Sequence, residues 1–297
     1  MLSSLPPTLK GILSCTLLFS FTTVLGAPLI ATALLKFIIP VPPIQKLFTR
    51  LATLIAETWM RLNNIWIALF HSTQFDVRGL ENLNPKGWYL ITANHQSWGD
   101  IFVMQKFLVG RIPMPKFFLK QQLIWVPVIG LCWWALDFPF MKRHSKEYLA
   151  KHPEKRGEDL ATTRRACEKF KDSPVSIVNY LEGTRFTAEK HQQQNSPYQY
   201  LLKPKAGGVG FVLSAMGEQL HSLINITLYY QGHIPGFWDF MCGNTGDITM
   251  LVETCEIPEK FLGRDYGADE QFQQELRDWI NALWQEKDQQ LALLHEQ

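Results

Sequence analysis

The sequence has little that would indicate a metalloprotein, a disulfide-stapled protein or a nucleic-acid binder. Its 297 residues include only five cysteines, which lie far apart and form neither a Cys-x-x-Cys pair nor a cluster with histidine. An odd, scattered set of thiols is not typical of a disulfide framework or a zinc site, so we predict reduced cysteines and no bound metal. The net charge of +2 gives no overall attraction to nucleic acid. There is no internal repeat and no long disordered tract.

Charge is also absent from one long stretch near the N-terminus. No charged residue occurs from Gly11 to Leu35, and about 20 apolar residues suffice to span a bilayer. A signal peptide is the alternative, but only Lys10 precedes the run, which is longer than the ~7–15 residues of a signal-peptide core. We therefore expect membrane localisation, with the rest of the chain on the cytoplasmic face (of the inner membrane in a bacterium). The positive-inside rule gives this orientation from the basic residues that follow the run, which are Lys36, Lys46, Arg50 and Arg61.

A second N-terminal segment has helical periodicity. Prolines interrupt the chain at Pro40–Pro43, and residues 44–70 then repeat apolar side chains at three- and four-residue steps. This amphipathic helix either lies in the membrane interface or packs on the protein as an ordinary surface helix. We assign residues 1–72 to membrane-anchoring helices, as one span or a re-entrant hairpin plus the amphipathic helix, and residues 73–297 to the main domain. The apolar stripe consists of Leu47, Leu51, Leu54, Ile55, Thr58, Leu62 and Ile65.

The main domain alternates apolar strands with helices. Such alternation predicts an α/β fold with a parallel-rich mixed sheet flanked by helices, behind the N-terminal membrane-associated segment. The aromatic-rich stretch from Lys116 to Phe140 is interrupted by Pro127 and Gly130 and is too short for a span, so we expect core or a shallow membrane-touching element. We expect strands at 88–93, 175–180, 222–230 and 248–257, helices after 96 and at 158–171, 207–216 and 271–294, a charged loop at 142–155 and a polar connection at 187–200.

The segment Asn94–Asp100 places a histidine and a carboxylate five positions apart. On a regular helix this step separates the side chains by roughly 140°. His95 and Asp100 can therefore meet only if His95 lies in a loop after a strand and Asp100 lies in the first helical turn. Ser97 as N-cap and Asp100 at the third helical position would form a capping box that starts the helix there. Asp100 is then either only a cap beside an ordinary loop histidine, or one half of a general-base pair.

The general-base interpretation gives each residue of the pair a chemical role. A neutral histidine can take the proton of an alcohol near pH 7, and a carboxylate on its other nitrogen fixes the tautomer and stabilises the imidazolium. No Gly-x-Ser-x-Gly nucleophile motif occurs, and Ser97 is better used as a cap. The pair therefore indicates direct attack of a substrate hydroxyl on a thioester, without an acyl-enzyme.

Two further motifs are suited to phosphate. About eighty residues after Asp100 comes Glu182–Arg185, in which glycine permits close approach and arginine presents a planar fork of donors. The alternative is a turn with a Glu182–Arg185 salt bridge. Basic residues beside Pro204 then precede a glycine-led helix, whose free N–H groups can bind an anion or can form a plain helix start.

The order of these motifs behind a hydrophobic N-terminus resembles the lysophosphatidate (1-acylglycerol-3-phosphate) acyltransferase family of glycerolipid acyltransferases, over roughly residues 40–260. The resemblance implies that His95 is the general base and that Asp100 orients it. It also implies that Lys120 begins a segment shaping the acyl tunnel and headgroup site, and that Arg143 ends a block that holds the glycerol phosphate (the alternative is a solvated basic turn). The substrate-binding set it implies is Lys120, Arg143, Glu182, Gly183, Thr184, Arg185, Lys203 and Lys205.

The resemblance implies an acyltransferase that moves a fatty acyl chain from acyl-CoA or acyl-ACP to the sn-2 hydroxyl of a lysophospholipid. Lysophosphatidate is the expected acceptor, although segments 184–187 and 236–243 resemble the lysocardiolipin-type subgroup. The alternatives are another headgroup, a thioesterase or phospholipase using the same pair to activate water, and a catalytically silent membrane scaffold. No cofactor is expected besides the thioester substrate. The expected partners are membrane lipids and, for one donor, acyl carrier protein.

Overall fold

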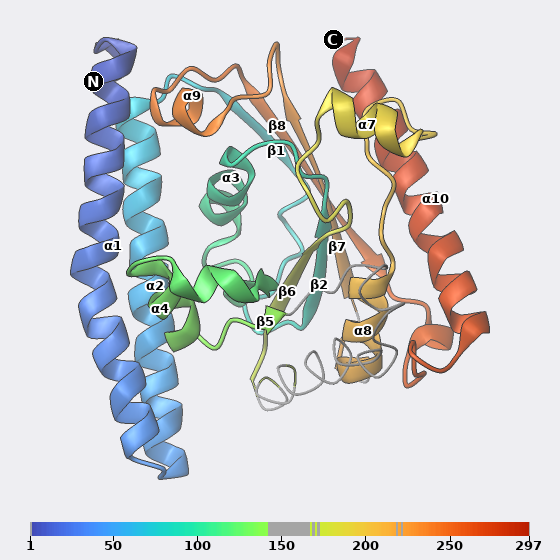
Figure 1. The fold of residues 1–297 in the computed structure, drawn as a ribbon, viewed down its shortest axis with the longest axis horizontal. Coiled ribbons are helices and arrows are strands. Elements are labelled where there is room, and N and C mark those ends of the chain that lie inside the picture. Colours follow the sequence, from blue (N-terminus) through green and yellow to red (C-terminus); the bar gives the residue numbers. More distant parts are fainter. Residues whose placement is uncertain are drawn as a thin grey trace.

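The computed structural model arranges the chain in layers around one sheet (Figure 1). A hairpin of two long helices, α1 and α2, lies on one side, and α3 lies between this hairpin and the sheet. Two other helices, α8 and α10, cover the opposite face of the sheet. These helices are α1 (Pro7–Ile38), α2 (Pro42–Phe70), α3 (Gly99–Leu108), α8 (Gly207–Met216) and α10 (Glu270–His295).

The structure describes most of the chain, including every other sequence motif introduced above apart from Arg143. That residue, the charged loop predicted at 142–155 and most of the helix predicted at 158–171 lie outside the described residues. The described residues are 2–141, 167, 170, 173–217, 219–220 and 222–296.

The described residues form a six-stranded, mostly parallel sheet, which confirms the predicted fold class. Only the β7–β8 pair is antiparallel among its neighbouring strands. A second sheet pairs β4 (Leu119–Lys120) with β5 (Phe140–Met141). In spatial order the large sheet contains β1 (Phe75–Arg78), β8 (Ile248–Glu256), β7 (Ser222–Tyr230), β2 (Tyr89–Ala93), β6 (Ser176–Tyr180) and β3 (Pro115–Phe117).

Alternation along the central strands divides the core into two halves. Leu90 and Leu223 belong to a cluster with α8 and α10. Ile91 and Ile224, one residue further on, belong to a cluster with α2 and α3 on the other face. Successive side chains of a strand point to opposite faces, so strands buried on both faces are apolar throughout. The central sheet is therefore held between two helical layers.

The α1–α2 hairpin is joined to itself and to the main domain by polar as well as apolar contacts. The Trp66 indole N–H donates to the Ser14 hydroxyl at 2.8 Å, and the Trp59 indole N–H donates to Thr22 at 3.1 Å. Helix α1 continues through Pro28 and is long and apolar enough to cross a membrane, by length and composition. Its partner α2 buries Trp66 in the same core cluster as the central strands.

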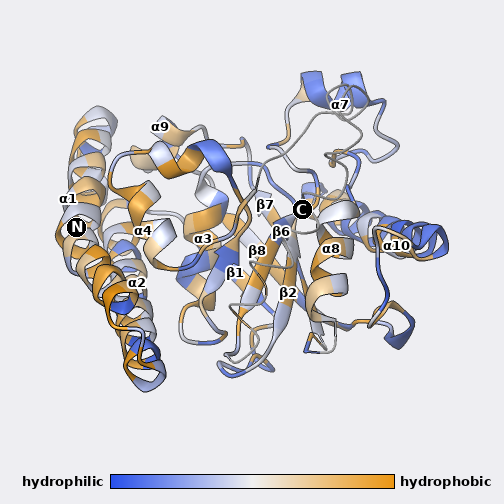
Figure 2. Ribbon diagram, turned by 60° about the horizontal axis from the view of Figure 1, so that its bottom comes forward, coloured by the Kyte–Doolittle hydropathy of each residue, from blue (hydrophilic) through white to orange (hydrophobic). Residues whose placement is uncertain are grey.

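Most of the apolar stripe predicted on α2 faces outward, although Ile55 packs against the cluster that contains Ala52. Leu47, Leu51 and Leu54 are exposed, Leu54 to 59%, and Figure 2 shows that hydrophobic residues recur along both helices of the hairpin. The helix packs instead through a face containing Ala52 and Ala56. An ordinary surface helix would bury its apolar stripe, so this exposed face is of the kind that contacts lipid or a partner.

The aromatic stretch before Phe140 contains short elements with two different surfaces. Helix α4 (Ile129–Ala135) buries Cys132 against α1, while Trp125 of the 3-10 helix η2 (Gln121–Trp125) is 84% exposed. An ion pair between Asp137 and Lys36, at 2.7 Å, ties the stretch to the end of α1. Part of the stretch is therefore core, and the membrane contact expected of its exposed part stays a prediction.

The sequence patterns missed several short elements. The predicted polar connection at 187–200 contains helix α7 (Ala188–Gln194), which Thr187 caps by accepting a hydrogen bond from the Lys190 N–H at 3.3 Å. Strand β1 and helix α9 (Phe237–Met241) were not predicted either. Both are too short to show a repeat of apolar residues.

His71, directly after α2, predicts acid sensitivity of this fold. Its ring packs between Trp66 and Phe240, and neither ring nitrogen has a hydrogen-bond partner among the described residues. Burial, with smaller contributions from Lys10 and Lys106, lowers the pKa of His71 from 6.5 to about 4. Because the unfolded chain then binds the proton more readily, the free energy of unfolding should fall as the pH falls from 6.5 to 4, by up to roughly 3 kcal/mol.

Thermal unfolding of His71→Phe between pH 7.5 and 5 tests this expectation. The substitution keeps an aromatic ring in place, so the variant should lose less stability on acidification than the wild type. The exposed His233 provides the control, since His233→Gln should keep the wild-type pH dependence. Parallel decreases in Tm for wild type and His71→Phe would contradict the assignment.

Candidate active site

The loop after β2 is held by hydrogen bonds to three residues outside it. The Asn94 side chain exchanges two hydrogen bonds with the Leu228 backbone, both 2.8 Å, and so extends the β2–β7 pairing beyond the strand. The next residue, His95, donates its backbone N–H to Glu182 Oε1 at 3.1 Å and accepts from the Phe186 N–H at 2.7 Å. The backbone of His95 is therefore held between β7 and the segment after β6.

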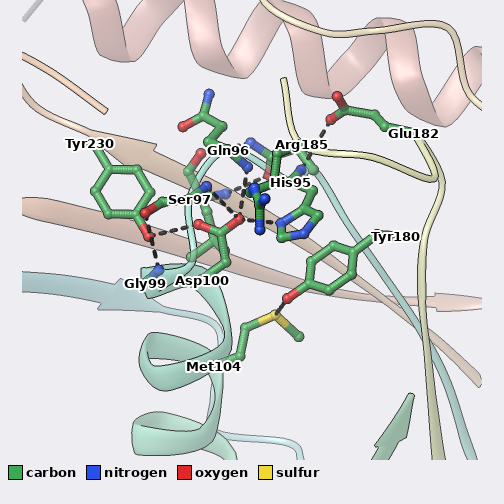
Figure 3. A network of polar contacts seen from close by, with 12 residues as sticks. His95, Gln96, Ser97, Gly99, Asp100, Met104, Tyr180, Glu182, Arg185 and Tyr230 are labelled. Atoms are coloured by element: carbon green, nitrogen blue, oxygen red, sulfur yellow. Dashed lines mark hydrogen bonds and ion pairs between the residues drawn. The ribbon is translucent and has the colours of Figure 1, made fainter. Parts of the chain in front are cut away.

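His95 and Asp100 are in direct contact, as the general-base interpretation requires (Figure 3). His95 Nδ1 lies 2.7 Å from Asp100 Oδ2. The same oxygen accepts from the N–H groups of Gln96 (2.7 Å) and Ser97 (3.0 Å), and Oδ1 accepts from the Tyr230 hydroxyl at 2.7 Å. Burial and the Asp100 charge raise the pKa of Tyr230 well above its ordinary value, so this phenol remains a donor. Asp100 is fully buried, whereas the His95 side chain is 15% exposed.

The start of α3 is capped almost as predicted. The helix begins at Gly99 after Trp98, one residue later than a Ser97 N-cap implies, because the Trp98 backbone is helical but has no capping side chain. One of the two bonds of a capping box is present, because Asp100 Oδ2 accepts from the Ser97 N–H at 3.0 Å. Ser97 Oγ accepts from the Gly99 N–H at 3.0 Å, whereas the Asp100 N–H bonds to the Ser97 carbonyl. Ser97 is buried and donates its hydroxyl to the Pro235 carbonyl at 2.6 Å. This hydroxyl is fully used in structure, which argues against a serine nucleophile.

An aromatic column leads away from the imidazole. Tyr180 stacks on His95 with a centroid distance of 4.0 Å and donates its hydroxyl to Met104 Sδ at 3.5 Å. Phe117 stacks on Tyr180 at 6.0 Å, and Phe138 stacks on Phe117 at 6.4 Å. Sequence reasoning missed this column, because only the fold brings β6 and β3 side by side.

Glu182 faces the sheet and His95, not Arg185. It is fully buried, and burial raises its pKa to about 8 although the His95 N–H bond opposes the shift. Lys287 of α10 is also fully buried and donates to the Ile226 carbonyl and to Thr227 Oγ1. Burial lowers the pKa of Lys287 to about 7, and the negative charges of nearby carboxylates, including Glu182, oppose this. The predicted alternative of a Glu182–Arg185 salt bridge is wrong for this structure, in which the two side chains have different partners.

Arg185 and Lys205 each contact a residue near the His95–Asp100 pair, the dyad. The guanidinium of Arg185 lies over the Trp98 ring, with Cζ 4.1 Å from the centroid. Gly183 has φ +69°, and a Cβ built there would be 3.2 Å from Lys205 Nζ. The structure thus brings together Glu182, Gly183, Arg185 and Lys205 from the predicted set.

The remaining predicted residues have other surroundings. Thr184 accepts from Lys190 Nζ at 2.9 Å, and Lys190, which sequence reasoning missed, also donates to the Arg185 carbonyl at 2.8 Å. Lys120 is exposed on β4. Lys203 lines an open cavity of about 550 Å³ beside α10. The described residues contain no group of three or more His, Cys, Asp or Glu side chains that could hold a metal ion.

Comparison with known proteins shows the family to which this chain belongs. The family model described as Acyltransferase matches residues 74–229, which include the whole dyad and Glu182–Arg185. The chain belongs to the acyltransferase family. The match covers strands β1 to β7 and therefore includes five of the six strands of the large sheet, leaving out β8.

Several relatives of this acyltransferase are named for the same reaction. Human 1-acyl-sn-glycerol-3-phosphate acyltransferase gamma is 25% identical over 83% of this chain, which spans 65% of that relative's length. The Arabidopsis thaliana protein 1-acyl-sn-glycerol-3-phosphate acyltransferase 3 is 24% identical over 87% of this chain and 68% of its own length. The crystal structure of the 1-acyl-sn-glycerophosphate (LPA) acyltransferase PlsC from Thermotoga maritima has the same fold, with TM-score 0.57, 17% identity and coverage of 97% and 98% of the two chains.

The Tyr230 contact predicts a change in the pH profile of acyl transfer. Tyr230→Phe leaves Asp100 Oδ1 without its donor, so we expect a loss of about 1–3 kcal/mol in the free energy of unfolding. The less stabilised carboxylate should hold the imidazolium more strongly and move the acid limb of kcat/KM to higher pH. Tyr229→Phe, a neighbouring phenol without a hydroxyl partner in the described residues, is the control. An unchanged acid limb in Tyr230→Phe would contradict this role.

The left-handed backbone at Gly183 predicts that alanine destabilises the protein at this position but not at Gly207. Gly183→Ala should cost about 1–2 kcal/mol in backbone strain and should displace Lys205. Gly207 begins α8 with nothing within 4 Å of a built Cβ, so Gly207→Ala should leave Tm unchanged or raise it. Chemical unfolding of both variants measures the difference, and equal stability would argue against the strain.

Proposed function

We propose that this acyltransferase moves a fatty acyl chain from an acyl-CoA or acyl-ACP thioester to the sn-2 hydroxyl of lysophosphatidate, giving phosphatidate. The observation that supports this most directly is the His95 Nδ1–Asp100 Oδ2 contact of 2.7 Å, with the aspartate fully buried. This contact leaves His95 Nε2 as the nitrogen available to a substrate. No metal or prosthetic group is required for the step.

The reaction follows from the orientation of the imidazole. Nε2 takes the proton of the acceptor hydroxyl while the hydroxyl oxygen attacks the thioester carbonyl carbon, and Asp100 stabilises the imidazolium. Collapse of the tetrahedral intermediate breaks the carbon–sulfur bond, and the imidazolium returns the proton to the leaving thiolate. A hydroxyl that attacks directly needs no enzyme nucleophile, which fits the structural use of the Ser97 hydroxyl.

The phosphate of the acceptor is assigned to Arg185 and Lys205. Arg185 is half-buried beside Trp98, and Lys205 lies against Gly183, where the absence of a side chain permits close approach. Guanidinium edges bind phosphate in a bidentate manner. Arg143 and Lys203 remain further candidates from the family resemblance.

The acyl chains are assigned to the apolar surfaces around the dyad. The Tyr180–Phe117–Phe138 column provides a route from His95 into the interior near α4. The exposed faces of α1 and α2 would lie in the membrane, with the main domain on its cytoplasmic side. Because α1 packs on α2, α4 and α9, a re-entrant or interfacial hairpin fits this arrangement better than an isolated span.

The decisive experiment is acyl transfer from labelled acyl-CoA to lysophosphatidate in membranes carrying wild type or variants. His95→Ala should lose at least about 10²–10⁴-fold in turnover, since positioned base catalysis contributes that much. Arg185→Ala should mainly raise the acceptor KM, by about 10–100-fold for a lost charged hydrogen bond. Unchanged turnover in His95→Ala would reject the mechanism.

Two additional readouts separate the alternatives. Labelled fatty acid formed without any acceptor would identify a thioesterase or phospholipase. Product formed from other lysophospholipids but not from lysophosphatidate would keep the mechanism and replace the headgroup. A panel of lysophospholipids, including lysocardiolipin, tested with acyl-CoA and acyl-ACP, therefore completes the assay.

A further inference from the structure

The Arg185 guanidinium beside the dyad lies on an aromatic ring. Its Cζ atom is 4.1 Å from the centroid of the Trp98 ring, and across the described part of the chain no ion pair involves Arg185. A guanidinium that stacks through its face keeps its N–H edges free for a planar contact with phosphate. The Trp98 ring therefore contacts the Arg185 guanidinium without taking up its N–H donors.

The backbone on both sides of Trp98 is held firmly. Ser97 is buried and bonds to Pro235 and Gly99 through its hydroxyl. Gly99 is also buried, and a Cβ there would lie 2.6 Å from the Phe240 ring. Between two fixed neighbours, Trp98 is 47% exposed. The Trp98 indole takes no part in the hydrogen bonds of the His95–Asp100 pair or in the hydrophobic core, although Trp98 lies in the loop that joins the two residues.

Trp98 continues into an exposed apolar surface. Phe237 of α9 meets its ring edge-on at 6.1 Å, and Trp98, Phe237 and Trp238 are each 45–47% exposed; we call these three residues the aromatic rim. Trp238 in turn packs on α1, where its ring lies 2.8 Å from the position of a Cβ on Gly11. The three residues of the aromatic rim therefore lie between α1, the helix assigned to the membrane, and Arg185, the cation assigned to phosphate.

We propose that Trp98 is the positioning residue for Arg185, and that the aromatic rim receives the chain of the acceptor while Arg185 binds its phosphate. This inference rests on the proposed function. A cation stacked on an exposed apolar surface matches an amphiphile with an anionic head and a single chain. A phosphorylated glycerol without a chain would contact the cations assigned to phosphate but would make no contact with the aromatic rim.

The first test compares Trp98→Leu with Trp98→Phe. Leucine keeps the surface apolar but removes the ring, so the KM for lysophosphatidate should rise about two- to fivefold, the factor expected for one exposed cation–π contact. Phenylalanine keeps a ring face and should restore part of the affinity. In both variants kcat, Tm and the donor KM should stay at wild-type values. Leu293→Ala, which removes an exposed apolar side chain from α10, should change nothing.

A double-mutant cycle distinguishes positioning from a general structural effect. In an Arg185→Ala background, Trp98→Leu should raise the acceptor KM less than it does in the wild type, because no guanidinium remains to be held. Additive effects, or an unchanged KM in Trp98→Leu, would overturn the positioning role. Phe237→Ala should reduce the preference for long-chain over short-chain lysophosphatidate, and an unaltered preference would overturn the role of the rim.

Binding measurements keep this inference separate from the proposed reaction. Labelled lysophosphatidate is titrated into His95→Ala protein with and without Trp98→Leu. Weaker binding without the indole supports the inference even if the wild type forms no phosphatidate and the reaction assignment fails. Equal binding overturns it even if the wild type is an active lysophosphatidate acyltransferase.

Discussion

Burial of the Asp100 carboxylate is the constraint on which the rest of the site depends. A carboxylate without water is very costly unless its lone pairs are used. Here the donors are two backbone N–H groups of the preceding loop, the Tyr230 hydroxyl and the His95 imidazole. The donors come from the loop and from β7, and the carboxylate comes from the start of α3, so these three segments must lie together to satisfy it. The orientation of His95 is a consequence of satisfying the aspartate.

The parallel sheet explains why motifs eighty residues apart meet. Strands β2, β6 and β7 run in the same direction side by side, so their carboxyl ends lie along one edge, where ligands bind in open α/β sheets. The loop after β2 supplies His95, and the segment after β6 supplies Glu182 and Arg185. The His95 N–H bond to Glu182 joins the two. Lys287 places the C-terminal helix under the same edge of the sheet through its bond to β7.

Periodicity and local chemistry predicted most long elements and the dyad from the sequence. Helices α2, α8 and α10 and strands β2, β6, β7 and β8 lie where apolar repeats placed them, and the geometry of a five-residue step required the loop-and-helix arrangement seen for His95 and Asp100. The sequence could not predict contacts made only by folding. The stacking of Tyr180 on His95 and of Arg185 on Trp98 joins segments distant in sequence. The outward face of the α2 stripe was likewise undetermined, because an apolar stripe looks the same whether protein or lipid covers it.

The N-terminal hairpin forms part of the hydrophobic core of the main domain. Trp66, Ile67 and Phe70 of α2 lie in the same cluster as Ile91 and Val103 of the catalytic core. Removing α1 and α2 would expose this cluster and would not give a soluble catalytic domain. The hydrophobic interior and the exposed apolar surface are thus two sides of one pair of helices. Whatever surrounds the outer face of those helices therefore also affects the packing of β2 and α3, which flank the loop containing His95.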